Sequence, residues 1–194
     1  MKPLGIFCAW AMAAGAALAA DSAFTGAYRG ADPGLLSEVR TAFAAAPDSA
    51  SAAQALAARL DAGLPADRAA WPPVFLAYRA ALEGLAGKHS STPWEKYRRA
   101  KAGLAMFQGL AEAHPESVEI RMLRYSAGSQ LPEFFGAQAQ AEEDLRILAE
   151  GLVRGADPLV PAELRNGYIR WILDNGRPAP EIRARLEAAL GAAD

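Results

Sequence analysis

The chain has 194 residues, 52% of them hydrophobic, and its 20 basic and 22 acidic side chains give a net charge of −2. The charges are interspersed, without the basic patch or stripe of a nucleic-acid binder, so no nucleic-acid partner is expected. About a quarter of the residues are alanine and just 14 are Val, Ile or Thr, a composition that favours helices over strands. The sequence therefore predicts an all-α protein, and the length suits one domain.

Residues 1–20 have the features of a secretory signal peptide. Lys2 gives a positive start, residues 4–20 carry no charge, and residues 17–20 read Ala-Leu-Ala-Ala, an Ala-x-Ala cleavage site. We expect cleavage after residue 19 or 20 and a periplasmic or secreted bacterial protein. The alternative is an uncleaved anchor, which would still place residues 21–194 outside the cytoplasm. No later stretch approaches 18 apolar residues, so no membrane span is expected after cleavage.

Caps and breakers predict two helices in residues 21–64. The first runs over 33–46, with Asp32 as N-cap, Pro33 at its first position and Pro47 as its stop. A second, weaker helix covers 51–62 and ends at a glycine. We expect these helices to be loosely attached to a core of helical hairpins formed by residues 72–190.

The hairpin core begins with a helix from about residue 72 to 87, followed by the best-signalled helix of the chain. Thr92-Pro93-Trp94-Glu95 has the pattern of a capping box. In this motif the threonine hydroxyl accepts a hydrogen bond from the backbone amide of the glutamate, and the glutamate side chain reaches back to the backbone amide of the threonine. Apolar residues then recur at steps of three and four, and a proline marks the end. They are Tyr97, Ala100, Leu104, Phe107 and Ala111, with Pro115 as the stop.

Four further helices are expected over 116–129, 137–153, 161–174 and 179–190. Short loops join most helices, and short loops make sequence neighbours antiparallel. The last six helices therefore pair into three hairpins of uneven length. This predicts an irregular array of antiparallel hairpins, with seven or eight helices in all.

Two resemblances concern the middle of the chain. Gly103, Phe107 and Pro115 are spaced as in the second helix of a tetratricopeptide repeat. His114-Pro115-Glu116, the run Glu-Ile-Arg-Met-Leu-Arg over 119–124 and Leu-Pro-Glu-Phe-Phe-Gly over 131–136 resemble a family of small exported helical bacterial proteins without an established function. The resemblance implies a tetratricopeptide-like fold and brings no catalytic residues.

Residue types that carry catalysis or bind metals are scarce. The single cysteine, Cys8, lies within 1–20, so no disulfide and no cysteine-bound metal is expected in the rest of the chain. His89 lies in a polar loop and His114 at a helix end, where we expect structural roles. Neither a glycine-rich phosphate loop nor a G-x-S-x-G motif is present. No cofactor is expected, and an enzyme ranks third among the possible functions.

Arg121 and Arg124 are the first candidate site. At positions i and i+3 they share a helix face, and two guanidinium groups can hold a carboxylate or phosphate ligand. The alternative is an ion pair with Glu142, Glu143 or Asp144 of the next helix, which a hairpin would bring close. The first interpretation makes the protein an anion or small-ligand binder, and the second makes the arginines structural.

Phe134 and Phe135 are the second candidate site. They lie in a connection bounded by Pro132 and Gly136, where an aromatic side chain can anchor a partner or fill the core. Because a tight turn points adjacent side chains to different sides, we expect one ring to fill the interface of the helices at 116–129 and 137–153. The other ring is expected to be at least partly exposed.

The leading functional interpretation is a non-catalytic periplasmic protein–protein interaction module whose paired helices accept an envelope protein or peptide. The alternative is a small-ligand or anion binder that uses Arg121 and Arg124. If the protein is an interaction module, we expect an exposed apolar patch. If it binds a small ligand, we expect an enclosed pocket at the two arginines. If it is an enzyme, we expect several titratable side chains close together.

Overall fold

The structure is a computed structural model that describes residues 26–191, so the expected signal peptide at 1–20 lies outside the described residues. Within this range the fold is all-α, as predicted, with eight α-helices, three short 3-10 helices and no strand. The α-helices are α2 (Pro33–Phe43), α3 (Ala50–Gly63), α4 (Pro73–Lys88), α5 (Pro93–Ala113), α6 (Val118–Gly128), α7 (Gln138–Arg154), α8 (Ala162–Asn175) and α9 (Pro180–Gly191). The 3-10 helices are η1 (Gly26–Tyr28), η2 (Arg68–Ala70) and η3 (Glu133–Phe135).

Side-chain caps fix where several helices begin. Asp32 caps α2 by accepting a 2.7 Å bond from the amide of Leu35, and Thr92 accepts one of 3.3 Å from the amide of Glu95 at the start of α5. The reciprocal half of the capping box expected at α5 is replaced by an ion pair, because the Glu95 carboxylate accepts a 3.1 Å bond from Nε of Arg99.

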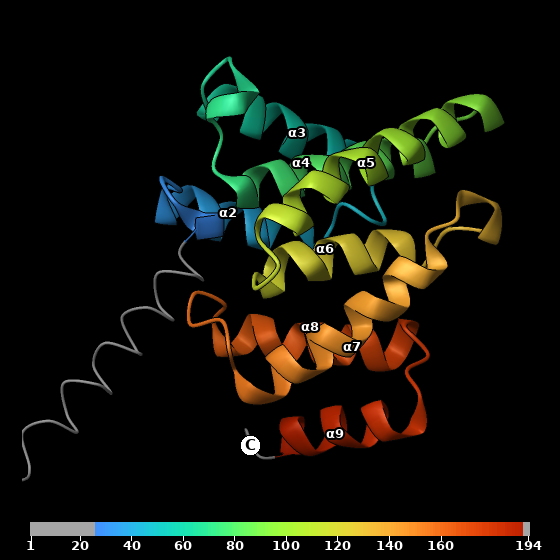
Figure 1. Ribbon diagram of the computed structural model, residues 1–194. Helices are drawn as coiled ribbons and strands as arrows, with labels where there is room; N and C mark the ends of the chain where they lie inside the picture. Colours follow the sequence, from blue (N-terminus) through green and yellow to red (C-terminus); the bar gives the residue numbers. More distant parts are fainter. Residues whose placement is uncertain (1–25, 192–194) are drawn as a thin grey trace, which may run out of the picture.

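The helices stack nearly in sequence order, from α3, α4 and α5 at one end, through α6, to α9 at the other (Figure 1). The expected partners α4 and α5, α6 and α7, and α8 and α9 are in contact, and α7 also packs on α9. A close approach of α4 to α5 requires a glycine at position 103. A Cβ built there would lie 2.8 Å from the backbone oxygen of Ala80.

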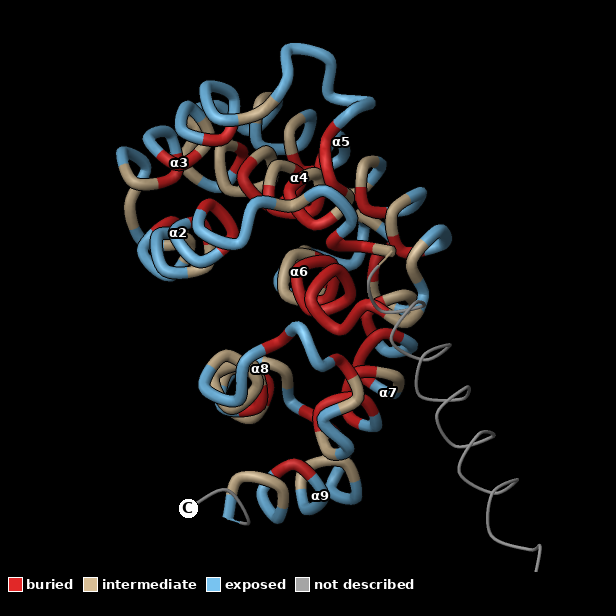
Figure 2. Tube along the Cα trace, turned by 90° about the vertical axis from the view of Figure 1, so that its left-hand side faces the viewer, coloured by how far each residue is buried: buried red, intermediate tan, exposed pale blue. Residues whose placement is uncertain are grey.

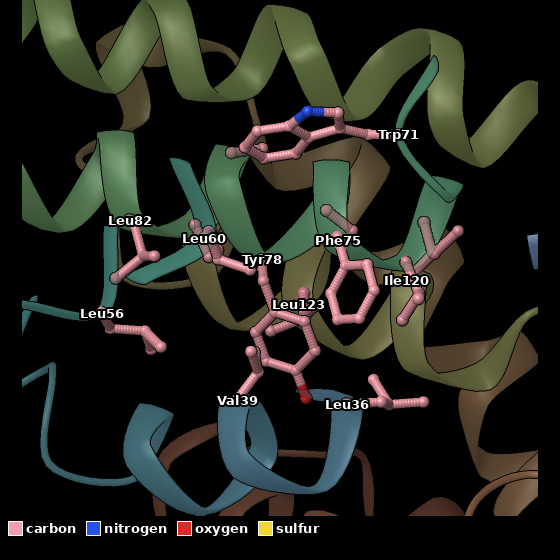
Figure 3. Packing of buried hydrophobic residues seen from close by; sticks show 14 of the residues in the cluster. Leu36, Val39, Leu56, Leu60, Trp71, Phe75, Tyr78, Leu82, Ile120 and Leu123 are labelled. Atoms are coloured by element: carbon pink, nitrogen blue, oxygen red, sulfur yellow. The ribbon is translucent and has the colours of Figure 1, made fainter. Parts of the chain in front are cut away.

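The first hydrophobic cluster lies among α2, α3, α4, α5 and α6 (Figure 3). Phe75 and Tyr78 of α4 occupy its centre, and Val39 of α2 and Leu60 of α3 are completely buried in it. This differs from the loose attachment expected for residues 21–64, because the apolar faces of α2 and α3 are part of the core. The expectation rested on the weak apolar pattern of α3, whose many alanines allow close packing without a strong stripe.

The second hydrophobic cluster joins α6, α7, α8 and α9, and α6 contributes to both clusters. Ile120 and Leu123 face the first cluster, whereas Met122 and Tyr125 face the second. Every residue from 118 to 125 is buried, and Figure 2 shows α6 as the buried centre of the stack. A helix buried on all sides must have partners for its polar side chains as well, and these partners shape the candidate sites.

Candidate interaction surface

Arg121 and Arg124 share one carboxylate of the neighbouring helix. Asp144 of α7 is fully buried and accepts bonds from Nη1 of Arg121 at 2.9 Å and from Nε and Nη2 of Arg124 at 2.7 and 2.6 Å. Nε of Arg121 donates to the backbone oxygen of Pro115 at 2.6 Å. The expected ion pair with an acidic residue of this helix is confirmed, and Asp144, rather than its exposed neighbours Glu142 and Glu143, is the partner.

The surroundings of the two arginines give a ligand little room. A hollow of about 170 Å³ lies beside Arg121, lined by Pro115 and residues of α6, α7 and the turn after α7, and Arg124 is not among them. The side chains of the two arginines are 9% and 7% exposed, and Asp144 already occupies the position that an anionic ligand would take. This arrangement holds α6 against α7.

Glu119 is the centre of a buried polar network that the sequence did not reveal. Its side chain is completely buried, and its carboxylate accepts bonds from Nε and Nη2 of Arg40 at 2.9 and 2.6 Å and from the hydroxyl of Tyr78 at 2.6 Å. The three residues come from α6, α2 and α4. A charge-assisted bidentate pair of this kind offsets the cost of placing a carboxylate inside the core.

A third buried carboxylate, Asp157, lies in the turn between α7 and α8. The hydroxyl of Tyr28 donates to its Oδ2 at 3.1 Å, and Nη2 of Arg40 donates to the backbone oxygen of the nearby Leu159 at 2.9 Å. Burial raises the pKa of Asp157 above the usual range of an aspartate. Residues of η1 and α2 thereby hold the turn that leads into the C-terminal helices.

Several titratable side chains therefore lie close together in the core, where they are paired with one another. Burial raises the pKa of Tyr28, Tyr78 and Tyr168, so these phenols stay protonated. The hydroxyls of Tyr28 and Tyr78 donate hydrogen bonds to Asp157 and Glu119 and do not act as bases. Neither the hollow beside Arg121 nor the groove described below is lined by a member of this network. A catalytic site needs room for a substrate at its reacting groups, and these carboxylates are occupied by their own partners.

An exposed set of stacked aromatic rings lies where η3 meets α5. We call Trp94, Tyr97, Phe134 and Phe135 the aromatic surface. Trp94 and Phe134 are 71% and 73% exposed, Tyr97 is 38% exposed and Phe135 is half-buried. The ring centroids of Phe134 and Phe135 are 4.6 Å apart, and Tyr97 lies 5.3 Å from Phe135 and 6.2 Å from Trp94. Large apolar side chains are seldom left so exposed in contact with one another, which makes this patch the candidate site.

Local backbone geometry places the two phenylalanines on this surface. Pro132 precedes the single turn of η3, and Gly136 ends that turn in the left-handed conformation at φ 70°. The expected difference between the adjacent rings is confirmed, since Phe134 is exposed and Phe135 is partly covered. The expected location of the covered ring is wrong. Phe135 packs against Tyr97 of α5, because η3 carries the ring across to α5.

The sequence did not assign Trp94 and Tyr97 to this surface, because each had a local explanation. Trp94 falls within the cap of α5, and Tyr97 continues the apolar spacing of Ala100 and Phe107. The two later residues are buried, as that spacing predicts, whereas Tyr97 is 38% exposed and contacts Phe135 of η3. A signal was nonetheless present, since Trp94 and Tyr97 are two aromatics at i and i+3 in the first turn of a helix.

A groove of about 540 Å³ lies on the other flank of α5, between α3 and the α4–α5 hairpin. Alanines of α3 line one wall, and a chain of ion pairs lines the other. Glu83 binds Arg79 and Arg99 at 3.1 Å each, and Arg99 also binds Glu95 at 3.1 Å. The lining carries two arginines and three acidic side chains, so the groove presents neither a large apolar face nor a strong excess of one charge.

The remaining candidate groups have structural contacts. Nε2 of His89 lies 3.1 Å from the backbone oxygen of Ala46, and Nδ1 of His114 lies 4.0 Å from the Glu116 carboxylate. Among residues 26–191, no group of three His, Cys, Asp or Glu side chains is arranged to hold a metal ion. In the same range no helix has both the length and the apolar character needed to cross a membrane. No protein-family model, curated protein or solved structure matches this chain.

Proposed function

We propose that this chain is a non-catalytic interaction module that docks an envelope protein or peptide through the aromatic surface. The observation that carries the proposal is the exposure of Trp94 and Phe134, at 71% and 73%, within a continuous stack of four rings. Aromatic side chains supply large contact area at low cost in conformational entropy and are enriched among the residues that dominate binding energy. Antiparallel hairpins of a tetratricopeptide-like type would hold these rings in a fixed arrangement.

The proposed location is the bacterial periplasm, reached through cleavage of residues 1–20. The features that support it are the uncharged run of residues 4–20 and the Ala-x-Ala site. Mass spectrometry of the protein from an envelope fraction should find the first residue to be Ala20 or Asp21. An intact chain recovered from the cytosol would contradict this part of the proposal.

Substitutions on the aromatic surface test the docking role. The variant Trp94→Ala/Phe134→Ala should fail to retain, from envelope extract, those proteins that the unchanged protein retains reproducibly, while its melting temperature changes little. Leu159→Ala is the matched control, because Leu159 is an exposed apolar residue, 38% exposed, in the turn after α7. Equal retention by the aromatic variant and the unchanged protein would exclude this surface as the docking site.

A further inference from the structure

The face of α5 that carries two of the rings also carries two cations. Trp94, Tyr97, Arg98 and Lys101 are spaced by three, one and three residues, which places them on one helix face, and all four are exposed. Arg98 has a partly buried carboxylate as its neighbour, with 3.8 Å between its Nη2 and Oε1 of Glu95. Lys101 forms no ion pair with any residue between 26 and 191.

The positive charge of this region contrasts with the rest of the chain. Beyond residue 20 the chain has three lysines, and all of them lie within residues 88–101. Together with two arginines they give this segment five cations against one acid, in a protein whose net charge is −2. Exposed rings beside the exposed cations Arg98 and Lys101 attract a partner that combines apolar side chains with negative charge.

We propose that the aromatic surface recognises an acidic peptide segment of its partner, one that carries at least one aromatic or leucine side chain. The rings contact the apolar side chain, and Arg98 and Lys101 contact flanking carboxylates at the rim. This inference rests on the proposed docking function and adds the chemistry of the occupant.

A protein segment suits this surface better than an anionic bilayer. Glu133 is exposed directly beside Phe134. Insertion of the two outer rings into a bilayer would bring the Glu133 carboxylate to negatively charged headgroups, which opposes binding. A peptide can direct its own carboxylates toward Arg98 and Lys101 and leave Glu133 in water.

The test is selection from a displayed library of random twelve-residue peptides on the purified protein. Peptides that combine a net negative charge with an aromatic residue or leucine should be enriched. The affinity of one such peptide, measured by fluorescence anisotropy, should fall about tenfold or more for Arg98→Glu/Lys101→Glu and should weaken as salt is raised. The matched control is Arg170→Glu/Arg185→Glu, which changes the net charge equally at exposed positions of α8 and α9 and should bind as the unchanged protein does.

The outcomes separate this inference from the docking function. Neutral or basic enriched peptides that still require Trp94 and Phe134 would overturn the acidic occupant and leave the docking function standing. Enrichment that does not depend on Trp94 and Phe134 would overturn both. Co-sedimentation with phosphatidylglycerol-containing vesicles, lost in Trp94→Ala/Phe134→Ala, would assign the surface to a membrane and likewise overturn both.

Discussion

At the scale of single residues, Asp144 neutralises two buried arginines with one carboxylate. Replacing it with alanine leaves two buried guanidinium groups without their counter-charge. Asp144→Ala should therefore lower the free energy of unfolding by about 3–5 kcal/mol, as for other broken buried ion pairs. Glu143→Ala, one residue away and exposed, should change it by less than about 0.5 kcal/mol. Denaturant titrations followed by circular dichroism compare the two variants. Equal small losses would mean that the arginines do not depend on Asp144.

Asp157 should make stability depend on pH. Its pKa is raised by burial, so between the usual aspartate range and its native value the folded protein binds more protons than the unfolded chain. Stability from this group is therefore complete at low pH and is lost as pH rises through that window. Asp157→Asn removes the ionisation and keeps a polar partner for Tyr28. As pH rises above the usual aspartate range, the variant should gain stability relative to the unchanged protein. Thermal melts at matched pH values measure this difference, and a constant difference would contradict the prediction.

At the scale of elements, the α4–α5 hairpin depends on how closely its helices approach. A Cβ at position 103 would lie 2.8 Å from the backbone oxygen of Ala80 and 3.2 Å from the amide nitrogen of Gly84. Gly103→Ala should therefore cost about 1–3 kcal/mol through overpacking. Gly109, in the same helix, has open space around its Cβ position, so Gly109→Ala should raise stability by about 0.5–1 kcal/mol through helix propensity. Chemical denaturation measures the free energy of unfolding of both variants. If both substitutions changed it in the same direction, α4 and α5 would be able to move apart to accommodate a Cβ at position 103.

Local signals in the sequence predicted the elements well and their surroundings poorly. The start of α5 follows from Thr92 and Pro93, because a cap involves residues three apart in the chain. Glu119 received no role because its partner Arg40 lies 79 residues earlier, and no spacing rule connects them. Phe134 and Phe135 were identified as a candidate site, whereas Trp94 and Tyr97 join them through contacts between distant segments. The pairing of Arg121 with Asp144 was predictable because it joins adjacent helices of one hairpin.

At the scale of the whole molecule, two hydrophobic clusters share α6 and are also joined by Tyr28 and Arg40. These two residues reach from the N-terminal segment to the turn between α7 and α8. The clusters should therefore unfold together in the unchanged protein, and Tyr28→Phe/Arg40→Ala should separate the two transitions. Trp71 reports on the first cluster and Trp171 on the second, so single-tryptophan variants that keep one of them can follow each. Coincident unfolding curves in the double variant would show that α6 alone couples the clusters.

The contact between Tyr28 and Asp157 spans 129 residues of chain, which has a consequence for the order of assembly. A polypeptide emerging from a ribosome or a translocation channel, amino end first, presents Tyr28 long before Asp157. Until the turn after α7 has emerged, the Tyr28 hydroxyl lacks its acceptor, and Nη2 of Arg40 lacks the backbone oxygen of Leu159. After Tyr28 emerges, α2 therefore remains incompletely anchored while a further 129 of the 194 residues, about two thirds of the chain, are delivered. The contacts of Tyr28 and Arg40 with the turn after α7 therefore form late, after most of the chain has emerged.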